Sequence, residues 1–227
     1  MIAVRRTSPL WDVLRSYEPR WGLAADMHYA QSIPGEAINV ARLGLADLSH
    51  RPRFGVKGPQ AANWLTKQGV ATPAQPNSWL ALDAADPGSF VLRLGLSEFL
   101  IEGKAANPLQ ARIEPPPPGV YPVLREDTEI ALLGPQVNEL LRQTCNVNFR
   151  ALDISARPVV LTFMVGITVT ILPGSLRDTP YYRLWCDYSF GNYLWQTLLE
   201  IASELGGGPI GADLCPEPPI NPDRRRP

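Results

Sequence analysis

Residues 54–65 read Phe-Gly-Val-Lys-Gly-Pro-Gln-Ala-Ala-Asn-Trp-Leu, and residues 130–141 read Ile-Ala-Leu-Leu-Gly-Pro-Gln-Val-Asn-Glu-Leu-Leu. Both stretches place the tripeptide Gly-Pro-Gln between a strand-like run and a helix-like run. In each, an apolar strand ends at the glycine, and proline opens the helix where its missing N–H costs nothing. The shared order and spacing predict two copies of one supersecondary unit.

The sequence around these stretches divides into two units, a linker and two terminal segments. Each unit predicts the order strand, helix, strand, strand, with a further helix after the last strand. Because strands and helices intermingle and hairpins are available, we expect an α+β fold with helices on one sheet face. The expected segments are an N-terminal helix and irregular segment over 1–36, a first unit over 37–114, a polyproline linker over 115–119, a second unit over 120–208 and a disordered tail over 209–227.

Hydrophobic periodicity gives the expected elements. A short helix follows Ser8-Pro9, no element is assigned from Arg20 to Pro34, and residues 37–49 are strand-like or mixed. Ser189 is expected to cap the last helix. No Gly-x-Gly-x-x-Gly motif follows a strand, which disfavours a doubly wound dinucleotide-binding fold. The remaining elements are strands at 53–57, 78–82, 90–96, 99–101, 128–133 and 181–186, one or two strands over 159–172 with a break at Gly166, a helical turn or two over 105–112, and helices at 59–68, 135–145 and 189–205.

Composition narrows the classes of partner. The chain has 227 residues and a formal net charge of −1, which gives no electrostatic case for binding nucleic acid or an anionic membrane. Its longest apolar stretch, residues 159–172, is too short to span a bilayer, and the N-terminus lacks the apolar core of a secretory signal. Three cysteines without metal-type spacing indicate reduced thiols, so we expect a cytoplasmic protein.

Several stretches resemble one known family. Residues 44–50, Gly-Leu-Ala-Asp-Leu-Ser-His, precede the first Gly-Pro-Gln unit, and residues 187–195, Asp-Tyr-Ser-Phe-Gly-Asn-Tyr-Leu-Trp, follow the strand at 182–186. Residues 134–141 are followed by Cys-Asn-Val-Asn at 145–148. In this order the stretches resemble the aminomethyltransferase (glycine cleavage T-protein) superfamily, with the gamma subunit of heterotetrameric sarcosine oxidase as the closest type. The resemblance covers most of residues 36–205.

The resemblance implies two folate-binding-type subdomains around a central cavity, and in catalytic members a C-terminal barrel, which we do not expect here. Catalytic members also carry an aspartate pair in the first unit, and Asp83 and Asp86 are the weak candidates for it. The family's pterin-binding glutamate has no counterpart in residues 172–180, which contain no glutamate. Loss of that carboxylate would leave buried pterin donors unpaired, at a cost of about 1–3 kcal/mol. The folate site is therefore expected to be absent or remodelled.

Other chemistry finds little support. Asp47, Ser49 and His50 lie on one segment and cannot form a nucleophile–base chain without a sharp bend, so local turn hydrogen bonding is favoured. His28 and His50 are the only histidines and neither neighbours a cysteine at ligand spacing, so no metal site is expected. Trp185 alternates with core residues and lies beside Arg183, which makes both candidates for a partner interface. Alternatively, helix 191–205 or the N-terminal segment covers Trp185.

Three functions remain open. The first is a non-catalytic, gamma-subunit-like scaffold in amine or one-carbon metabolism that contacts an oxidase or dehydrogenase subunit, or a second copy of itself. The second is a compact folate-dependent aminomethyltransferase that uses Asp83 or Asp86. The third is a tetrahydrofolate-binding module in which Lys57, Arg93 or Arg183 meets the glutamate tail. Folate affinity separates the first from the others, and turnover separates the second from the third.

Overall fold

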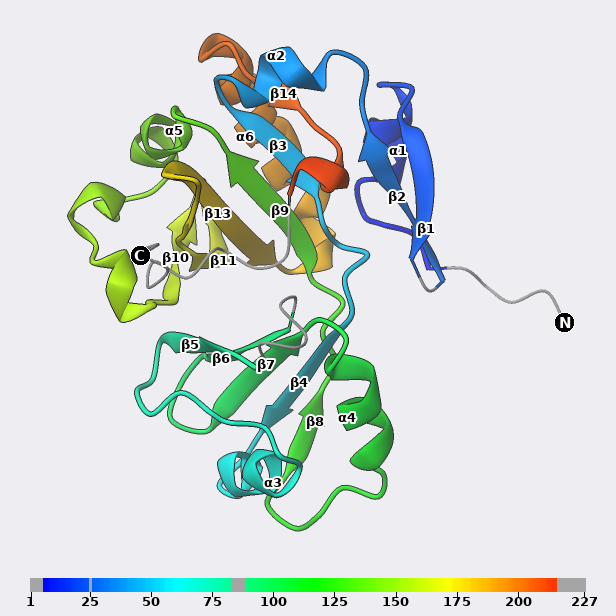
Figure 1. The fold of residues 1–227 in the computed structure, drawn as a ribbon, viewed down its shortest axis with the longest axis vertical. Coiled ribbons are helices and arrows are strands. Elements are labelled where there is room, and N and C mark those ends of the chain that lie inside the picture. The colour runs from blue at the N-terminus through cyan, green and yellow to red at the C-terminus, as the bar shows by residue number, and fades with distance from the viewer. Residues whose placement is uncertain (1–5, 25, 83–88, 216–227) are drawn as a thin grey trace, which may run out of the picture.

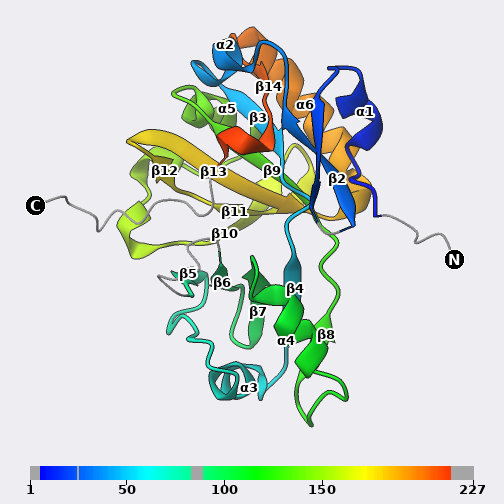
Figure 2. The same ribbon diagram turned by 45° about the vertical axis from the view of Figure 1, so that its right-hand side comes forward.

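The structure, a computed structural model, describes residues 6–24, 26–82 and 89–215. Its two main β-sheets lie one above the other (Figures 1 and 2). The larger sheet has the spatial order β10 (Val160–Met164), β11 (Ile167–Leu172), β13 (Thr179–Cys186), β9 (Thr128–Leu133), β3 (Gly44–Asp47) and β14 (Gly208–Pro209), and β12 (Ser175–Leu176) pairs with β13. The smaller sheet has the order β5 (Ser78–Ala81), β6 (Phe90–Arg93), β7 (Glu98–Glu102), β4 (Arg53–Lys57) and β8 (Tyr121–Val123).

Each sheet carries its own helices and its own apolar core. Helices α5 (Val137–Thr144) and α6 (Gly191–Glu204) pack on the seven-stranded sheet, with Leu140 and Leu198 in the shared core. Helices α3 (Ala61–Lys67) and α4 (Ala106–Arg112) pack in the same way on the five-stranded sheet. The chain is thus a mixed α/β fold with two layers of helix on sheet, in accord with the predicted intermingling of strands and helices.

The two Gly-Pro-Gln turns are built alike. The backbone of Gly58 has φ +119° and that of Gly134 has φ +139°, a region that favours glycine. The backbone N–H of Gln60 donates to the carbonyl of Gly119 at 3.0 Å, and that of Gln136 to the carbonyl of Arg42 at 3.1 Å. Each turn therefore ties its helix to the segment that leads into a neighbouring strand, β8 beside β4 in one sheet and β3 beside β9 in the other. Both helices begin after the glutamine, two residues later than the sequence predicts.

Two segments lie in a different sheet from the one expected. Strand β3, assigned above to the first unit, pairs with β9, and strand β8, which follows the polyproline segment, pairs with β4. Each of these two strands therefore pairs with a strand of the other expected unit. The five-stranded part is instead inserted between neighbouring strands β3 and β9, through crossover segments 48–52 and 124–127. Periodicity along a strand carries no information about which sheet receives it.

The N-terminal segment also differs from expectation. Residues Arg20–Pro34, which were assigned no element, contain a hairpin of β1 (Arg20–Ala24) and β2 (Met27–Ser32). Its side chains are mostly half-buried, so the alternation that signals a strand is weak. Helix α1 (Trp11–Arg15) precedes the hairpin and helix α2 (Glu36–Val40) follows it.

Other boundaries shift for local reasons. The predicted break at Gly166 is confirmed as the turn of the β10–β11 hairpin. Strand β6 ends at Arg93. The N–H of Leu94 donates to the backbone carbonyl of Glu98 and closes the turn that follows the strand. The last helix begins at Gly191 without a side-chain cap, so the cap expected from Ser189 is wrong; the side chain of Asp187 instead caps the short 3₁₀ turn over residues 188–190 that precedes the helix. Short 3₁₀ turns complete the fold at η1 (Phe149–Ala151), η2 (Ile154–Ala156), η3 (Tyr188–Phe190) and η4 (Ala212–Leu214).

Across the described ranges, no helix has the length and apolar character that crossing a lipid bilayer requires.

Candidate functional site

Four buried charged side chains meet between the two sheets, where the resemblance implies a central cavity. Glu102 ends β7 and Arg53 begins β4 on the five-stranded side, whereas Glu129 lies on β9 and Arg183 on β13 on the other side. Their exposed fractions are 7% for Arg53, 1% for Glu102 and 0% for Glu129 and Arg183. Strand pairing sets the arrangement, because Arg53 lies directly opposite Glu102, and Trp185 opposite Glu129.

These side chains form one connected ion-pair network. The guanidinium of Arg183 donates to both Glu102 and Glu129, with its Nε 2.5 Å from Glu129 Oε1. Arg53 donates from Nη1 to Glu129 Oε2 at 3.3 Å and from Nη2 to the carbonyl of Ser49 at 2.8 Å. Buried charges are tolerated only when paired in this way. The network therefore joins the two sheets through Arg183.

Aromatic rings fill the space beside the network. Trp79, Phe90 and Trp185 belong to one buried cluster that includes residues from both sheets. The guanidinium carbon of Arg183 lies 5.0 Å from the ring centre of Phe90 and 5.3 Å from that of Trp185. The indole Nε1 of Trp185 donates to Glu102 Oε2 at 3.2 Å. The region between the sheets is thus occupied by the protein's own side chains.

Trp185 and Arg183, the two candidates for a partner interface, are both buried. Trp185 is 3% exposed and Arg183 is fully buried. The cover is neither helix α6 nor the N-terminal segment, the two alternatives considered from the sequence. It is the five-stranded sheet, which contributes Trp79 and Phe90 to the same cluster. The sequence could not show this, because the packing of one sheet on the other is a long-range contact.

The two glutamates of the network have opposite pKa shifts. Burial raises the pKa of Glu129 to about 7, although Arg183 opposes the shift, and the nearby charge of Glu102 adds to it. Burial also disfavours the ionised form of Glu102, but the charges of Arg183, Arg53 and Arg51 outweigh burial and lower the pKa of Glu102. Glu102 is thus the ionised partner of Arg183. The carboxyl group of Glu129 is fully buried by the protein, which suits a structural role.

A second polar cluster, formed by Ser8, Asp47 and Ser49, contacts the network at Glu129. Asp47 accepts hydrogen bonds from Ser8 Oγ at 2.5 Å and from the N–H of Ser49 at 2.9 Å. Ser49 Oγ in turn accepts from the N–H of Glu129 at 3.0 Å. The imidazole of His50 stacks on Tyr29, with ring centres 4.1 Å apart. The local turn bonding expected for this segment is confirmed for Asp47 and Ser49 but not for His50, whose buried Nδ1 has no hydrogen-bond partner among the described residues.

His50 predicts a specific loss of stability in acid. Burial, helped by Arg51 and Arg53, lowers the pKa of His50 from 6.5 to about 3. Below about pH 6.5, His50 therefore binds a proton in the unfolded chain but stays neutral in the folded chain. The contribution of neutral His50 to the free energy of unfolding is lost as pH falls. Between about pH 8 and about pH 5 the loss is about 2 kcal/mol. We expect His50→Phe, which keeps the stacked ring, to remove this part of the pH dependence.

Urea unfolding of the native chain and of His50→Phe, each at about pH 8 and about pH 5, gives the pH-dependent loss of stability in each protein. The difference between the two losses is the contribution of His50. That difference cancels the opposite contribution of Glu129, whose raised pKa favours the folded state as pH falls through about 7. Parallel pH profiles for the native chain and His50→Phe would contradict the prediction.

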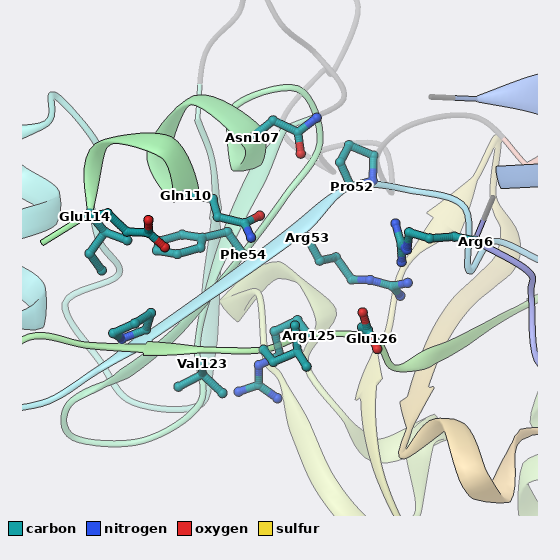
Figure 3. Close-up of a pocket in the computed structure, with 13 residues that line it drawn as sticks. Arg6, Pro52, Arg53, Phe54, Asn107, Gln110, Glu114, Val123, Arg125 and Glu126 are labelled. Carbon is teal, nitrogen blue, oxygen red and sulfur yellow. The ribbon is translucent and has the colours of Figure 1, made fainter. Parts of the chain in front are cut away.

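A pocket of about 480 Å³ opens beside the network, at the crossover segments (Figure 3). Arg53 and Phe54 lie along β4 in its centre, and Arg6 and Glu126 lie together at one end (Figure 3). Its arginines already have acidic partners: Arg125 lies 2.5 Å from Glu98, and Arg53 is paired as described above. The pocket therefore presents both signs of charge and no unpaired cation cluster.

The folate candidates do not converge. Lys57 is exposed at the end of β4. The guanidinium of Arg93 donates to four backbone carbonyls, in residues 73, 74, 95 and 96, and so fastens two loops of the five-stranded part. Arg183 lies in the buried network. Asp83 and Asp86, the catalytic candidates, lie outside the described residues. The structure does not bring Lys57, Arg93 and Arg183 together.

Sequence reasoning missed Arg53, Glu102 and Glu129. The available signal was a charged residue within an otherwise apolar strand, as in Thr-Glu-Ile-Ala-Leu-Leu over residues 128–133. A charge that interrupts such a strand needs a buried partner. The sequence shows each of these charges in its strand, and Arg183 likewise, but only the fold shows that they meet.

No family model matches the chain, and no curated protein matches it by sequence. The chain is similar to solved structures, of which two are described. Glycine cleavage system aminomethyltransferase T from Bartonella henselae has a TM-score of 0.70 at 17% identity, covering 92% of this chain and 60% of the aminomethyltransferase chain. A chain of heterotetrameric sarcosine oxidase from Corynebacterium sp. U-96, solved in complex with pyrrole 2-carboxylate, has a TM-score of 0.63 at 21% identity, covering 89% and 97%.

This chain thus spans 60% of the aminomethyltransferase and nearly the whole of the sarcosine oxidase chain. The resemblance predicted from the sequence is confirmed at the level of the fold: this chain has the fold of glycine cleavage aminomethyltransferase T and of a chain of heterotetrameric sarcosine oxidase.

Proposed function

We propose that this chain is a non-catalytic scaffold of the sarcosine-oxidase-gamma type, which acts by contact with another protein in cytoplasmic amine or one-carbon metabolism. The partner is an oxidase or dehydrogenase subunit, or a second copy of this chain. Support comes from the 97% coverage of a chain that belongs to a heterotetramer. Because the likeness is one of fold, the function is an inference by analogy.

One observation carries the proposal: the space between the sheets is filled. Arg183 and Trp185 occupy it from the seven-stranded side, and Glu102 and Phe90 meet them from the other side. A tetrahydrofolate at this place would have to displace a buried ion pair and two aromatic rings. Removing one partner of such a pair costs about 3–5 kcal/mol, which a ligand would have to return. The residues present do not fit the cofactor.

We also propose that the two sheets are copies of one duplicated unit. Their strand orders correspond, with β7, β4 and β8 of one sheet matching β13, β9 and β3 of the other. Counting back from each Gly-Pro-Gln makes Arg53 equivalent to Glu129, and these two residues form an ion pair. Their cross-strand neighbours, Glu102 and Trp185, are likewise hydrogen-bonded to each other. Equivalent positions thus meet across an approximate two-fold axis, as in a symmetric dimer.

The second candidate is a tetrahydrofolate-binding module or compact folate-dependent aminomethyltransferase. The specific observation in its favour is the TM-score of 0.70 to aminomethyltransferase T, over 92% of this chain. Its binding residues would be Lys57, Arg93 or Arg183, and its catalytic residues Asp83 or Asp86. Turnover with an aminomethyl donor would separate the enzyme from the module.

Titration with 5-formyltetrahydrofolate separates the two candidates. We expect no saturable change in tryptophan fluorescence and no shift in melting temperature at millimolar ligand, because the inter-sheet space is filled. A functional folate site would stabilise the chain by about 2.7 kcal/mol at 100 times Kd. Saturable binding that weakens in Lys57→Ala or Arg93→Ala would overturn the scaffold proposal.

A further inference from the structure

A second pocket, about 540 Å³ in volume, lies against helix α5, away from the inter-sheet network. Its walls are α5, the link over residues 145–148 and the short turn η1, and Phe149 forms part of its apolar base. The volume falls within the range of about 300–1,000 Å³ typical of small-molecule sites. The polar side chains that line it are Asn138, Arg142, Cys145, Asn146, Asn148 and Arg150.

Tertiary contacts hold the walls in place. The ring of Phe149 packs edge-on against Tyr182, with centres 5.5 Å apart. The hydroxyl of Tyr182 donates to Asn138 Oδ1 at 3.4 Å, which leaves the amide nitrogen of Asn138 as a donor. At the end of α5, the N–H of Val165 donates to the carbonyl of Thr144 at 3.0 Å. The walls of the pocket are therefore held by packing and hydrogen bonds to the folded core.

The pocket is electropositive. Its lining includes Arg142 and Arg150, and no aspartate or glutamate is among the described residues that form it. Glu139, just outside, accepts two hydrogen bonds from Arg142, at 2.5 and 3.0 Å. Arg150 has no ion pair within the described part of the chain. Arg142 and Arg150 thus share one nearby carboxylate, that of Glu139, so positive charge is in excess here although the whole chain has a net charge of −1.

We propose that this pocket binds the oxyanion group of a small molecule, a phosphate or a carboxylate, between Arg142 and Arg150. Guanidinium groups bind both anions through paired N–H donors, and such charge-assisted bonds are the strong ones. The amides of Asn138, Asn146 and Asn148 supply further donors around the same space. The inference does not depend on the proposed scaffold function.

Cys145 provides a local readout, because it lines the pocket and is half-buried, whereas Cys186 and Cys215 are only 4% and 2% exposed. The full chain is alkylated with neutral N-ethylmaleimide at about pH 8, since burial raises the pKa of the Cys145 thiol. Inorganic phosphate and acetate are added in separate arms, at an ionic strength held constant with chloride. We expect at least one anion to slow the modification of Cys145 severalfold and saturably, as followed by mass spectrometry.

Variants then locate the site. Arg142→Gln/Arg150→Gln should bind the protecting anion about tenfold more weakly or worse. Arg15→Gln/Arg112→Gln, which removes the same charge from other exposed surfaces, should bind it normally. Asn148→Asp should also weaken protection, by adding a negative charge. Stronger protection by phosphate indicates a phosphorylated ligand, and stronger protection by acetate a carboxylic acid. Protection by neither anion, or equal protection in both double variants, would overturn the proposal.

Discussion

Arg183→Met is expected to lower the free energy of unfolding by about 3–5 kcal/mol, the cost of breaking a buried ion pair by removing one partner. Arg183 is fully buried and donates to both Glu102 and Glu129. Without it, Glu129 keeps Arg53 at 3.3 Å, whereas Glu102 keeps only the hydrogen bond from Trp185. A carboxylate enclosed in this way has no water to compensate for the missing cation. Equilibrium unfolding in urea near neutral pH measures the loss.

Two variants control for this result. Arg142→Met removes a guanidinium from an exposed pair with Glu139 and should change stability far less. The double variant Arg183→Met/Glu102→Gln should recover part of the loss, because it removes the carboxylate that the single variant strands. A single variant as stable as the native chain, or a double variant less stable than the single one, would show that the network does not join the sheets.

Gly134→Ala is the second large expected effect, a destabilisation of about 3 kcal/mol or more, from a backbone conformation nearly confined to glycine. Gly134 has φ +139°, and a Cβ there would lie 2.5 Å from the carbonyl oxygen of Arg42. That carbonyl is fixed, since it accepts the N–H of Gln136 at 3.1 Å. Neither partner can move without opening the turn that leads from β9 into α5. Gly58 meets the same obstacle at Gly119 in the other sheet.

Gly69→Ala is the matched control. Gly69 also has a positive φ, +79°, but a Cβ there would meet no atom within 4 Å. It should therefore show only the conformational cost of about 1–2 kcal/mol. Urea unfolding of both variants, compared with the native chain, separates the clash from the backbone preference. Equal losses for Gly134→Ala and Gly69→Ala would refute the close approach to Arg42.

Local sequence signals predicted most of the elements and both Gly-Pro-Gln turns. Strand β4 coincides with the predicted 53–57, and the break at Gly166 is the turn of a hairpin. These features depend on nearby residues, through alternation, helical periodicity and the freedom of glycine at positive φ. The hairpin β1–β2 was not predicted, because most of its side chains are half-buried and their burial alternates weakly. The resemblance of ordered short stretches also pointed to the correct fold.

By itself, then, the sequence determined the kinds of element, their order and the two repeated turns. Tertiary structure alone decided that β3 and β8 exchange sheets, that Trp185 is buried, and that Arg183 meets Glu102 across 81 residues of chain. The physical reason is range. A turn is fixed by the torsions of a few neighbouring residues, whereas a buried ion pair forms only where two distant strands exclude water together.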